Sequence, residues 1–550
     1  MNYKVILRKI MLSTLLVWLC IPVKASAAGQ QLLTEPFLQC PTDTTVTVVW
    51  FTSVNTVENY IVYGKKMSQK ASADTKKLTR MRSFDNRTIQ IYRHEALATE
   101  LPLNKTGNER VPYQVISDGV KSKQYYLQAV PQVDVSMKIL LTSDCQLKEM
   151  SAANYQKVVE TAGHIDAVFY AGDLVNIPDL AEEWFPLNSS VSFFSLLQGT
   201  ADKQIHGNTY QGGAILQEAP IYISPGNHEF MGRYSTVFDL GLQFNDTMPA
   251  SYGTRNQTFN TISFEEIFNT PDNQDKLYYA VTIGNIRLVV LNVTRMWRSN
   301  EVGTKSDYSE DIRDIGNPDT TSEGAIIFEP IQKGSAQFQW LQKEVTSEAY
   351  QNAGYRVVMF HHAPHGLGGN IVPPFTDPIR KDVYDNNGQL QQILYEYPKE
   401  NDYLIRDLEP LLKESGTDLV LNGHSHLWNR FRDECGMNYL ETSNVGNTYG
   451  AFDGQVSDSE TGSRTSRIPS DLSCFDQSNY LLSGDPGGLK PVFPTICSYQ
   501  QKPYIASNTL TVFSLFDTES GIIESYWFDT EKPDSEPVKF DSFQAKRIVK

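Results

Sequence analysis

Positive charge is scarce in this chain. Its 550 residues include 48 Lys and Arg against 64 Asp and Glu, which gives a formal net charge of -16. Nonspecific nucleic-acid binding needs a basic face that displaces counterions from phosphates, so we predict no nucleic-acid-binding face. An anionic substrate would need a local source of positive charge, and bound metal ions are the obvious source.

Long apolar runs are absent after the first residues. The run Ile10–Val23 follows Lys4, Arg8 and Lys9 and precedes an Ala-Ser-Ala sequence at 25–27. A basic start, a short apolar stretch and an A-x-A site predict a signal peptide over residues 1–27. The apolar stretch is too short for a membrane span. We therefore expect an exported protein, periplasmic or secreted, with no membrane span.

Cysteine is sparse, with six in the chain. Cys20 falls in the predicted signal peptide, and Leu19 before it argues against a lipid anchor, which needs a small residue there. The remaining five are an odd number for an oxidising compartment. Cys474 and Cys497 are candidates for a disulfide across a surface segment, but all five are equally compatible with buried, reduced thiols.

Helical periodicity is missing from residues 32–134. Short alternating runs occur instead, separated by polar turns, at 45–52, 59–63, 88–92, 113–116 and 125–130. Strands at this spacing predict a β-sandwich. The segment contains one histidine, His94, and no clustered carboxylates, so we expect it to support the protein without taking part in chemistry.

From residue 135 to 550 the pattern changes to strands that alternate with helices, which predicts a layered α/β domain. Expected strands are 137–142, 165–170, 221–224, 278–283, 286–291, 355–360 and 418–421, expected helices are 152–162, 336–345 and 403–412, and a closing hairpin is expected at 509–516 and 521–528. Long insertions separate them, at 177–218, 244–276, 294–333, 365–388 and 446–507. Insertions of this length are usually functional or mobile, and we expect these to wall the site.

Five of the expected strands end in polar clusters. These clusters contain Asp144, then Asp173, then Asn227-His228-Glu229, then His361-His362, and finally His424 and His426. Ligands of α/β sheets gather outside the carboxyl ends of the strands, so the clusters are predicted to converge on one site. Carboxylate, amide and imidazole ligands together suit Zn, Fe or Mn better than Ca, which prefers oxygen alone. Asp173 is the candidate bridge between two ions.

The order of these motifs resembles the signature of the calcineurin-like metallophosphoesterases, closest to the purple-acid-phosphatase branch. The motifs are Asp144, Gly172-Asp173, Gly226-Asn227-His228-Glu229, His361 and Gly423-His424-x-His426, and residues 36–50 are similar to the fibronectin-type-III-like module that precedes that catalytic domain. The resemblance implies an α/β (α+β) four-layer β-sandwich flanked by helices, preceded by an all-β fibronectin-III-like sandwich.

The resemblance also implies a mechanism. Metal 1 would be held by Asp144, Asp173 and His426, and metal 2 by Asp173, Asn227, His361 and His424. A hydroxide between two divalent ions would attack phosphorus, and His228 would assist the leaving group. We therefore expect a metal-dependent phosphatase or phosphodiesterase whose substrate is a phosphate-ester small molecule or a phosphorylated polymer.

Two positions depart from the family pattern. Gln146 stands where many members have His, and Asn176 stands where the purple enzymes have Tyr. Alternation along a strand would keep Asp144 and Gln146 on one side and turn Cys145 into the core. We expect Gln146, Asn176 and His362 to be weak ligands or supporting residues, with a divalent metal 1 and no iron–phenolate colour. His365 is expected in the pocket wall.

These departures support a second hypothesis, a non-catalytic binding or scaffold protein of the cell envelope on the same fold. Two metals per chain favour the enzyme, and one or none favours the binder. The residues leave open monoester or diester substrates, the metal, and the oligomeric state.

Overall fold

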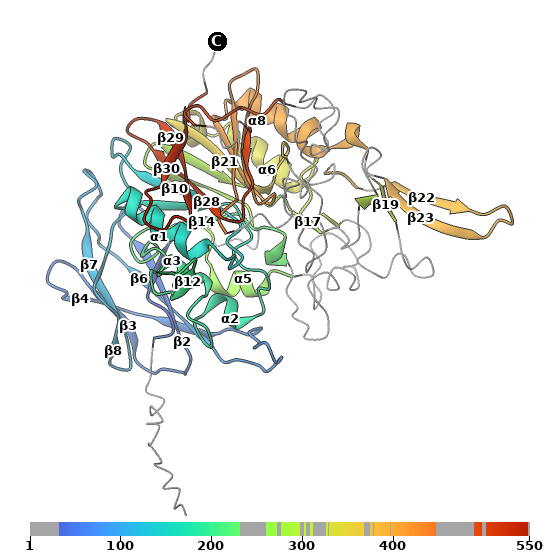
Figure 1. The fold of residues 1–550 in the computed structure, drawn as a ribbon. Helices are drawn as coiled ribbons and strands as arrows, with labels where there is room; N and C mark the ends of the chain where they lie inside the picture. Colours follow the sequence, from blue (N-terminus) through green and yellow to red (C-terminus); the bar gives the residue numbers. More distant parts are fainter. Residues whose placement is uncertain are drawn as a thin grey trace, which may run out of the picture.

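The fold is described from a computed structural model of the chain (Figure 1). It describes residues 32–230, 260–271, 277–296, 302–303, 309–311, 326–327, 329–367, 375–377, 379–396, 398–446, 489–497 and 502–547. The predicted signal peptide, Cys474, and much of the insertions 244–276, 294–333 and 446–507 lie outside these residues. Within this part of the chain, no helix is both long and apolar enough to cross a membrane.

Two sheets form the centre of the larger domain. The first has the order β14 (Ile221–Ile223), β11 (Ala167–Tyr170), β10 (Lys138–Thr142), β28 (Leu510–Asp517), β29 (Ile522–Asp529) and β30 (Val538–Gln544). The second has the order β15 (Tyr279–Ile283), β16 (Ile286–Val290), β21 (Tyr355–His362), β24 (Leu419–Gly423), β26 (Asn438–Thr442), β25 (Trp428–Arg432) and β27 (Tyr504–Ile505). The strands that carry the motifs pair in parallel within each sheet: β10 pairs with β11 and β11 with β14 in the first, and β21 pairs with β24 in the second.

The burial pattern of these strands produces four layers. Alternate residues such as Leu141, Met359 and Leu421 fill one core between the two sheets. Their neighbours face outward, because side chains of a strand alternate between its faces. Leu140 packs with helix α1 (Ser151–Ala162), and Val358 packs with α6 (Ala336–Val345) and α8 (Glu409–Ser415). The predicted four-layer sandwich flanked by helices is confirmed.

Most expected elements occur within a few residues of their predicted bounds. The expected helix 403–412 is divided into a π-helical turn, Leu404–Leu408, and α8. Strand β30 was not expected, and β21 extends two residues further, to include His361 and His362. The insertion 177–218 contains α2 (Ala181–Trp184), α3 (Phe193–Leu197), β12 (Lys203–Ile205) and β13 (Asn208–Tyr210), and two further short helices are α5 (Ile262–Ile267) and α7 (Glu348–Gln351).

The N-terminal region consists of two antiparallel sheets, as expected. One has the order β1 (Phe37–Gln39), β2 (Val46–Thr52), β6 (Tyr92–Ala98) and β5 (Asp74–Lys77). The other has β4 (Gln69–Ser72), β3 (Asn59–Tyr63), β7 (Val111–Ser117) and β8 (Val120–Lys121), with β9 (Tyr125–Leu127) also paired to β7. The strand expected at 88–92 was misplaced, since β6 begins at Tyr92. The fibronectin-III-like assignment and the domain boundary near residue 134 stay predictions.

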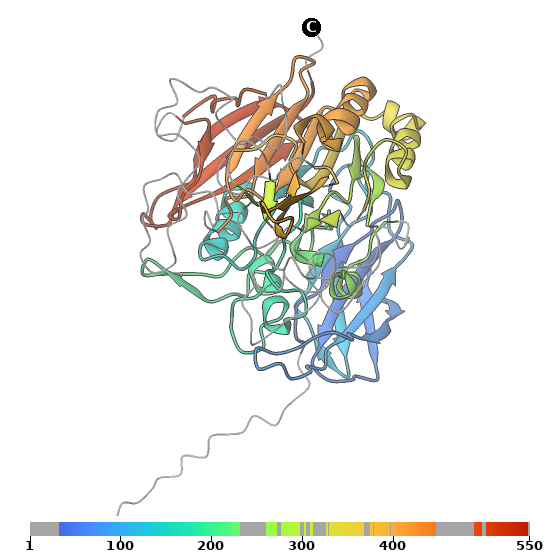
Figure 2. The same cartoon turned by 90° about the vertical axis from the view of Figure 1, so that its right-hand side faces the viewer.

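The N-terminal sandwich packs against the larger domain (Figure 2). Phe37 and Phe51 share a buried core with Phe194 and Phe268. The Tyr113 hydroxyl donates a hydrogen bond of 2.6 Å to the backbone oxygen of Gln217. Through these contacts the sandwich is packed against the larger domain by a shared apolar core and a buried hydrogen bond.

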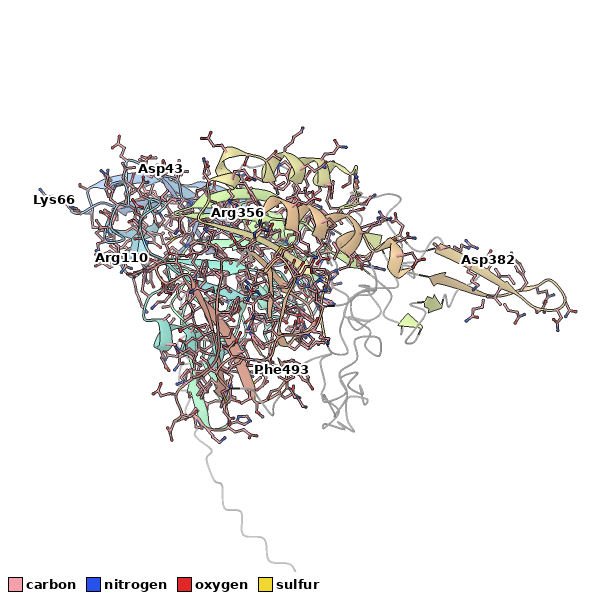
Figure 3. The ribbon with its side chains drawn as sticks, turned by 90° about the horizontal axis from the view of Figure 1, so that it is seen from above. Asp43, Lys66, Arg110, Arg356, Asp382 and Phe493 are labelled. Carbon is pink, nitrogen blue, oxygen red and sulfur yellow. The ribbon has the colours of Figure 1, made fainter. Side chains whose placement is uncertain are left out.

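A hairpin extends from the opposite side of the molecule. It is formed by β22 (Ile379–Tyr384) and β23 (Leu390–Glu396), which continue a sheet with β18 (Val302–Gly303) and β19 (Ser309–Asp311). Figure 3 shows Asp382 on this hairpin, far from Asp43 and Lys66 at the other end of the molecule. This part of the insertion 365–388 therefore projects outward, where we had expected it to wall the site. A short pair, β17 (Arg295–Met296) with β20 (Ile326–Ile327), lies in the preceding insertion.

Candidate metal centre

The proposed ligands come from both sheets. Asp144, Asp173 and Asn227 follow β10, β11 and β14 of the first sheet. His361 lies at the end of β21, and His424 and His426 follow β24 of the second. All six side chains are buried. The site forms where the carboxyl ends of parallel strands from the two packed sheets meet.

Asp144, Asp173 and His426 form one group, with one potential ligand atom of each within 4.8 Å of the others. The Nε2 atom of His426 lies 3.4 Å from Oδ1 of Asp144. The other oxygen of Asp144 accepts a 2.9 Å hydrogen bond from the backbone N–H of His424. This group is the set that the family resemblance assigns to metal 1.

His361, His362 and His424 form a second group, again with ligand atoms within 4.8 Å of one another. All three rings surround the side-chain oxygen of Asn227, at 3.1, 3.3 and 3.0 Å respectively. Adjacent residues of a regular strand face opposite sides, but the pairing of β21 with β24 shifts register between Met359 and His362. Such an irregularity re-aims side chains, which explains how both histidines reach one site.

Asp173 joins the two groups, because its Oδ2 atom lies 3.2 Å from Nε2 of His361. The other ring nitrogen of His361 lies 2.7 Å from the backbone oxygen of Ala171, which only accepts hydrogen bonds. Nδ1 therefore carries a proton, and Nε2 is turned toward Asp173.

The charges of the site are strongly coupled. Burial by itself would raise the pKa of Asp173, but His361 and His228 outweigh it and hold that pKa below its usual value. Burial would lower the pKa of His361, yet the Asp173 carboxylate raises it to about 10. Burial lowers the pKa of His362 and His424 well below the usual value, as do their neighbouring imidazoles. Neutral imidazole is the form that binds metals.

These residues fit a pair of cations. Asp144 Oδ1 is buried and has no hydrogen-bond donor among the described residues, although it faces the His426 ring. Burying a carboxylate oxygen without a donor is costly, and a bound cation removes that cost. Carboxylate and imidazole groups so placed are the donor set of Zn, Fe and Mn sites.

The three residues expected to be weak or supporting ligands differ in their placement. His362 belongs to the second group. Gln146 donates a 3.1 Å hydrogen bond to Oδ2 of Asp173. The Asn176 amide donates to the backbone oxygen of Gln146 at 2.7 Å, so it supports the Gln146 loop.

Strand alternation does not explain the positions of Asp144 and Gln146. Strand β10 ends at Thr142, and Asp144 and Gln146 adopt left-handed conformations with φ of 52° and 40°. The expectation that they sit on an extended strand was wrong. Cys145, however, is buried in the core with the residues of α1, as expected.

His228 lies at the edge of the site. Its Nδ1 atom is 2.8 Å from the backbone oxygen of Asn176, and its Nε2 atom is 3.8 Å from Oδ2 of Asp173. Because the carbonyl accepts a hydrogen bond from Nδ1–H, the Nε2 atom faces the metal groups. Burial lowers the pKa of this ring, and the Asp173 carboxylate opposes that effect.

Two buried glutamates support the ligand loops, and sequence reasoning gave neither a role. Glu229 accepts the backbone N–H groups of Asp173, Leu174 and Gly226 at 2.9, 2.9 and 2.7 Å. Glu441 on β26 accepts the N–H of Ser425 at 2.7 Å. Burial raises their pKa values to about 7 and about 8. Glu229 is part of a quoted motif, whereas the only sequence signal for Glu441 is an acid inside a short apolar strand.

Comparison with known proteins identifies the family to which the chain belongs. The model of the calcineurin-like phosphoesterase family matches residues 137–427. The chain belongs to the calcineurin-like phosphoesterase family. The expectation of a metal-dependent phosphoric ester hydrolase is thereby confirmed, and the match spans all of the strands that carry the proposed ligands.

Two solved structures are similar to this chain. One is the purple acid phosphatase PPD1 from yellow lupin (Lupinus luteus) seeds, with a TM-score of 0.53 and 15% identity, covering 92% of this chain and 73% of that chain. The other is PhoD, with a TM-score of 0.46 and 13% identity, covering 93% of this chain and 90% of that chain. At such identities the likeness to the lupin enzyme shows the fold alone, and it is consistent with the purple-acid-phosphatase-like branch. No curated protein matches the sequence.

Proposed function

We propose that this phosphoesterase is an exported enzyme that hydrolyses phosphate esters at a dinuclear metal centre. The observation that carries the proposal is the pair of buried ligand groups joined through Asp173. Asp144, Asp173 and His426 would hold one ion. The other would be held by Asp173, Asn227, His361 and His424, with His362 beside it. Divalent Fe, Zn or Mn suits this set of donors.

When bound, the two ions would supply positive charge to the substrate phosphate and lower the pKa of an attacking water. The protein fixes the geometry. Asp173 is held between the two groups by the N–H of His228, which donates to its Oδ1 atom at 2.9 Å. The backbone oxygen of Ala171 orients the His361 ring through Nδ1. These contacts set the ligand positions before any metal enters.

His228 is the proposed proton donor to the leaving oxygen. The Asn176 carbonyl accepts a hydrogen bond from Nδ1–H, so Nε2 holds a transferable proton only in the imidazolium form, which the nearby Asp173 carboxylate favours. A group that protonates the leaving oxygen matters most when that oxygen is strongly basic.

The proposed substrate is a phosphate ester of a small molecule or a phosphorylated polymer. The chain carries a net charge of -16, so the bound ions would be the main attraction for an anionic ester. Export rests on the basic and apolar N-terminal pattern over residues 1–27. The N-terminal sandwich would support the catalytic domain through the core that contains Phe37 and Phe51.

Turnover of a generic aryl phosphate tests the proposal. Asp173→Asn and His424→Ala should fold like the wild type by circular dichroism and lose turnover by roughly 10³-fold or more. Asp418→Asn is a matched control, because Asp418 is a buried carboxylate that accepts backbone N–H groups before β24, at the strand's other end. Equal activity of Asp173→Asn and the wild type would refute the proposal.

A further inference from the structure

Backbone strain occurs at four of the six proposed ligands. Asp144, Asp173, His424 and His426 all have positive φ, of 52°, 56°, 86° and 58°. Residues with a Cβ rarely adopt this conformation, and it persists only where the surrounding structure enforces it. Whatever holds these loops in place therefore determines where the ligands point.

In the His424–His426 loop, the two strained residues flank Ser425. The N–H of Ser425 donates a 2.7 Å hydrogen bond to Oε1 of Glu441. The same oxygen accepts the Ser443 hydroxyl at 2.6 Å, and Oε2 accepts the Asn429 amide at 3.0 Å. Glu441 is only 2% exposed, so these protein donors satisfy both carboxylate oxygens.

Glu441 is carried by a strand inside the second sheet. β26 pairs in parallel with β24, opposite Asn422, and in antiparallel fashion with β25, opposite Asn429. The pairing on both sides fixes the backbone of Glu441, and its side chain reaches the loop that leaves β24. A rigid strand is thus connected directly to the peptide between the two histidines.

We propose that Glu441 is a positioning residue of the metal centre, which holds the peptide between His424 and His426 so that each imidazole enters a different ligand group. His426 belongs to the group of Asp144 and Asp173, and His424 to the group of His361 and His362. One hydrogen bond at Ser425 therefore sets ligands of both ions. The inference rests on the proposed function, since it needs the metal centre.

Glu229, in the 3-10 turn His228–Phe230 that follows β14, supports ligand loops of the first sheet in a similar way. Its carboxylate accepts the N–H of Asp173, which is itself left-handed, and the N–H of Gly226, which precedes the ligand Asn227. A buried glutamate thus supports strained ligand loops on each side of the centre. Such supporting partners typically alter metal affinity 10–100-fold when removed.

The test is the affinity of the metal-free full chain for Zn²⁺ alone, measured by competition with a chromophoric chelator. Glu441→Ala should bind Zn²⁺ about 10–100-fold more weakly than the wild type. Glu441→Gln should remain within about threefold, because its amide oxygen still accepts the Ser425 N–H and the Asn429 amide can turn to match it. Asp418→Asn, the buried carboxylate control, should bind like the wild type.

A spectroscopic readout separates positioning from general destabilisation. With Co²⁺ in place of Zn²⁺, the visible absorption bands report ligand geometry, and they should change in Glu441→Ala but stay as in the wild type in Glu441→Gln and Asp418→Asn. If Glu441→Ala does not fold, Glu441→Met keeps most of the volume without the acceptor and takes its place.

The proposal is overturned if Glu441→Ala retains wild-type affinity and spectrum, if Glu441→Gln is as weak as Glu441→Ala, or if Asp418→Asn is equally weakened. Failure of the wild type itself to bind metal would overturn the proposed function instead, so the two failures are distinguishable.

Discussion

The Oδ2 atom of Asp173 and the Nε2 atom of His361 lie 3.2 Å apart, although the two residues belong to different sheets. Asp173 follows β11 of the first sheet, and His361 ends β21 of the second. The apolar core between the sheets fixes their distance. The candidate centre is therefore a consequence of how the two sheets pack, and mutations that move one sheet edge against the other should affect it.

Gly226 lies against the Asp173 loop within the first sheet. A Cβ there would collide with Oδ1 of Asp173 and lie 2.5 Å from its backbone nitrogen. Gly226→Ala should push Asp173 away from His361 and lower Zn²⁺ affinity by about 10-fold or more. Chelator competition measures the effect, with Gly354→Ala as control, since the nearest atom to its Cβ would be the backbone oxygen of Asn285, at 3.1 Å. Wild-type affinity in Gly226→Ala would contradict the close approach.

Replacing His228 should affect substrates according to their leaving groups. His228→Asn removes the proposed proton donor near Asp173. An alkyl phosphate, whose leaving oxygen is strongly basic, should lose about 10²–10⁴-fold in turnover, whereas p-nitrophenyl phosphate should lose far less. Comparing kcat for the two substrates tests this. An equal loss for both would exclude proton donation by His228.

The loaded protein should be colourless. Asn176 stands where a tyrosine ligand would give an iron–phenolate band, and its amide is turned to the backbone oxygen of Gln146. We expect no strong visible charge-transfer absorption after loading with iron in air. A strong band in the spectrum of the wild type would show that a phenolate reaches the metal.

Asp402 should make stability depend on pH. Burial raises its pKa to about 7, against the backbone N–H groups of Phe375, Leu404 and Ile405, which lower it. The folded pKa of Asp402 exceeds the unfolded value of about 3.9. The contribution of Asp402 to the free energy of unfolding is therefore complete below about pH 4 and is lost as the pH rises through about 7. Asp402→Asn keeps an acceptor and cannot ionise.

Thermal unfolding of both proteins at several pH values measures this effect. The stability of the wild type relative to Asp402→Asn should fall between pH 4 and 7 by an amount on the order of a few kcal/mol. A difference between the two unfolding temperatures that does not vary with pH would contradict the burial of an ionisable Asp402.

The sequence predicted what depends on local pattern. Each motif follows an apolar run, so the strand ends and the six candidate ligands could be predicted from the local pattern, whereas their division into two groups came from the family resemblance. Helix α6 was predicted at its observed bounds, 336–345, because Ser335 caps it through the N–H of Phe338 and its apolar residues repeat at helical intervals.

Features that depend on tertiary contacts were missed. His362 was expected only as a weak ligand or supporting residue, because no sequence pattern marks the register shift between β21 and β24 that brings it into the second group. Glu441 supports the histidine loop only because β26 lies beside β24. The left-handed conformation of Asp144 arises from contacts with residues far along the chain, such as the His424 N–H.

The number of metal ions per chain tests the account most directly. Elemental analysis of purified, metal-loaded protein should give two ions per chain for the wild type. Asp173→Asn should bind fewer than two, because it lacks the carboxylate that joins the two groups. One ion or none in the wild type would contradict a dinuclear centre and favour a binding protein on the same fold.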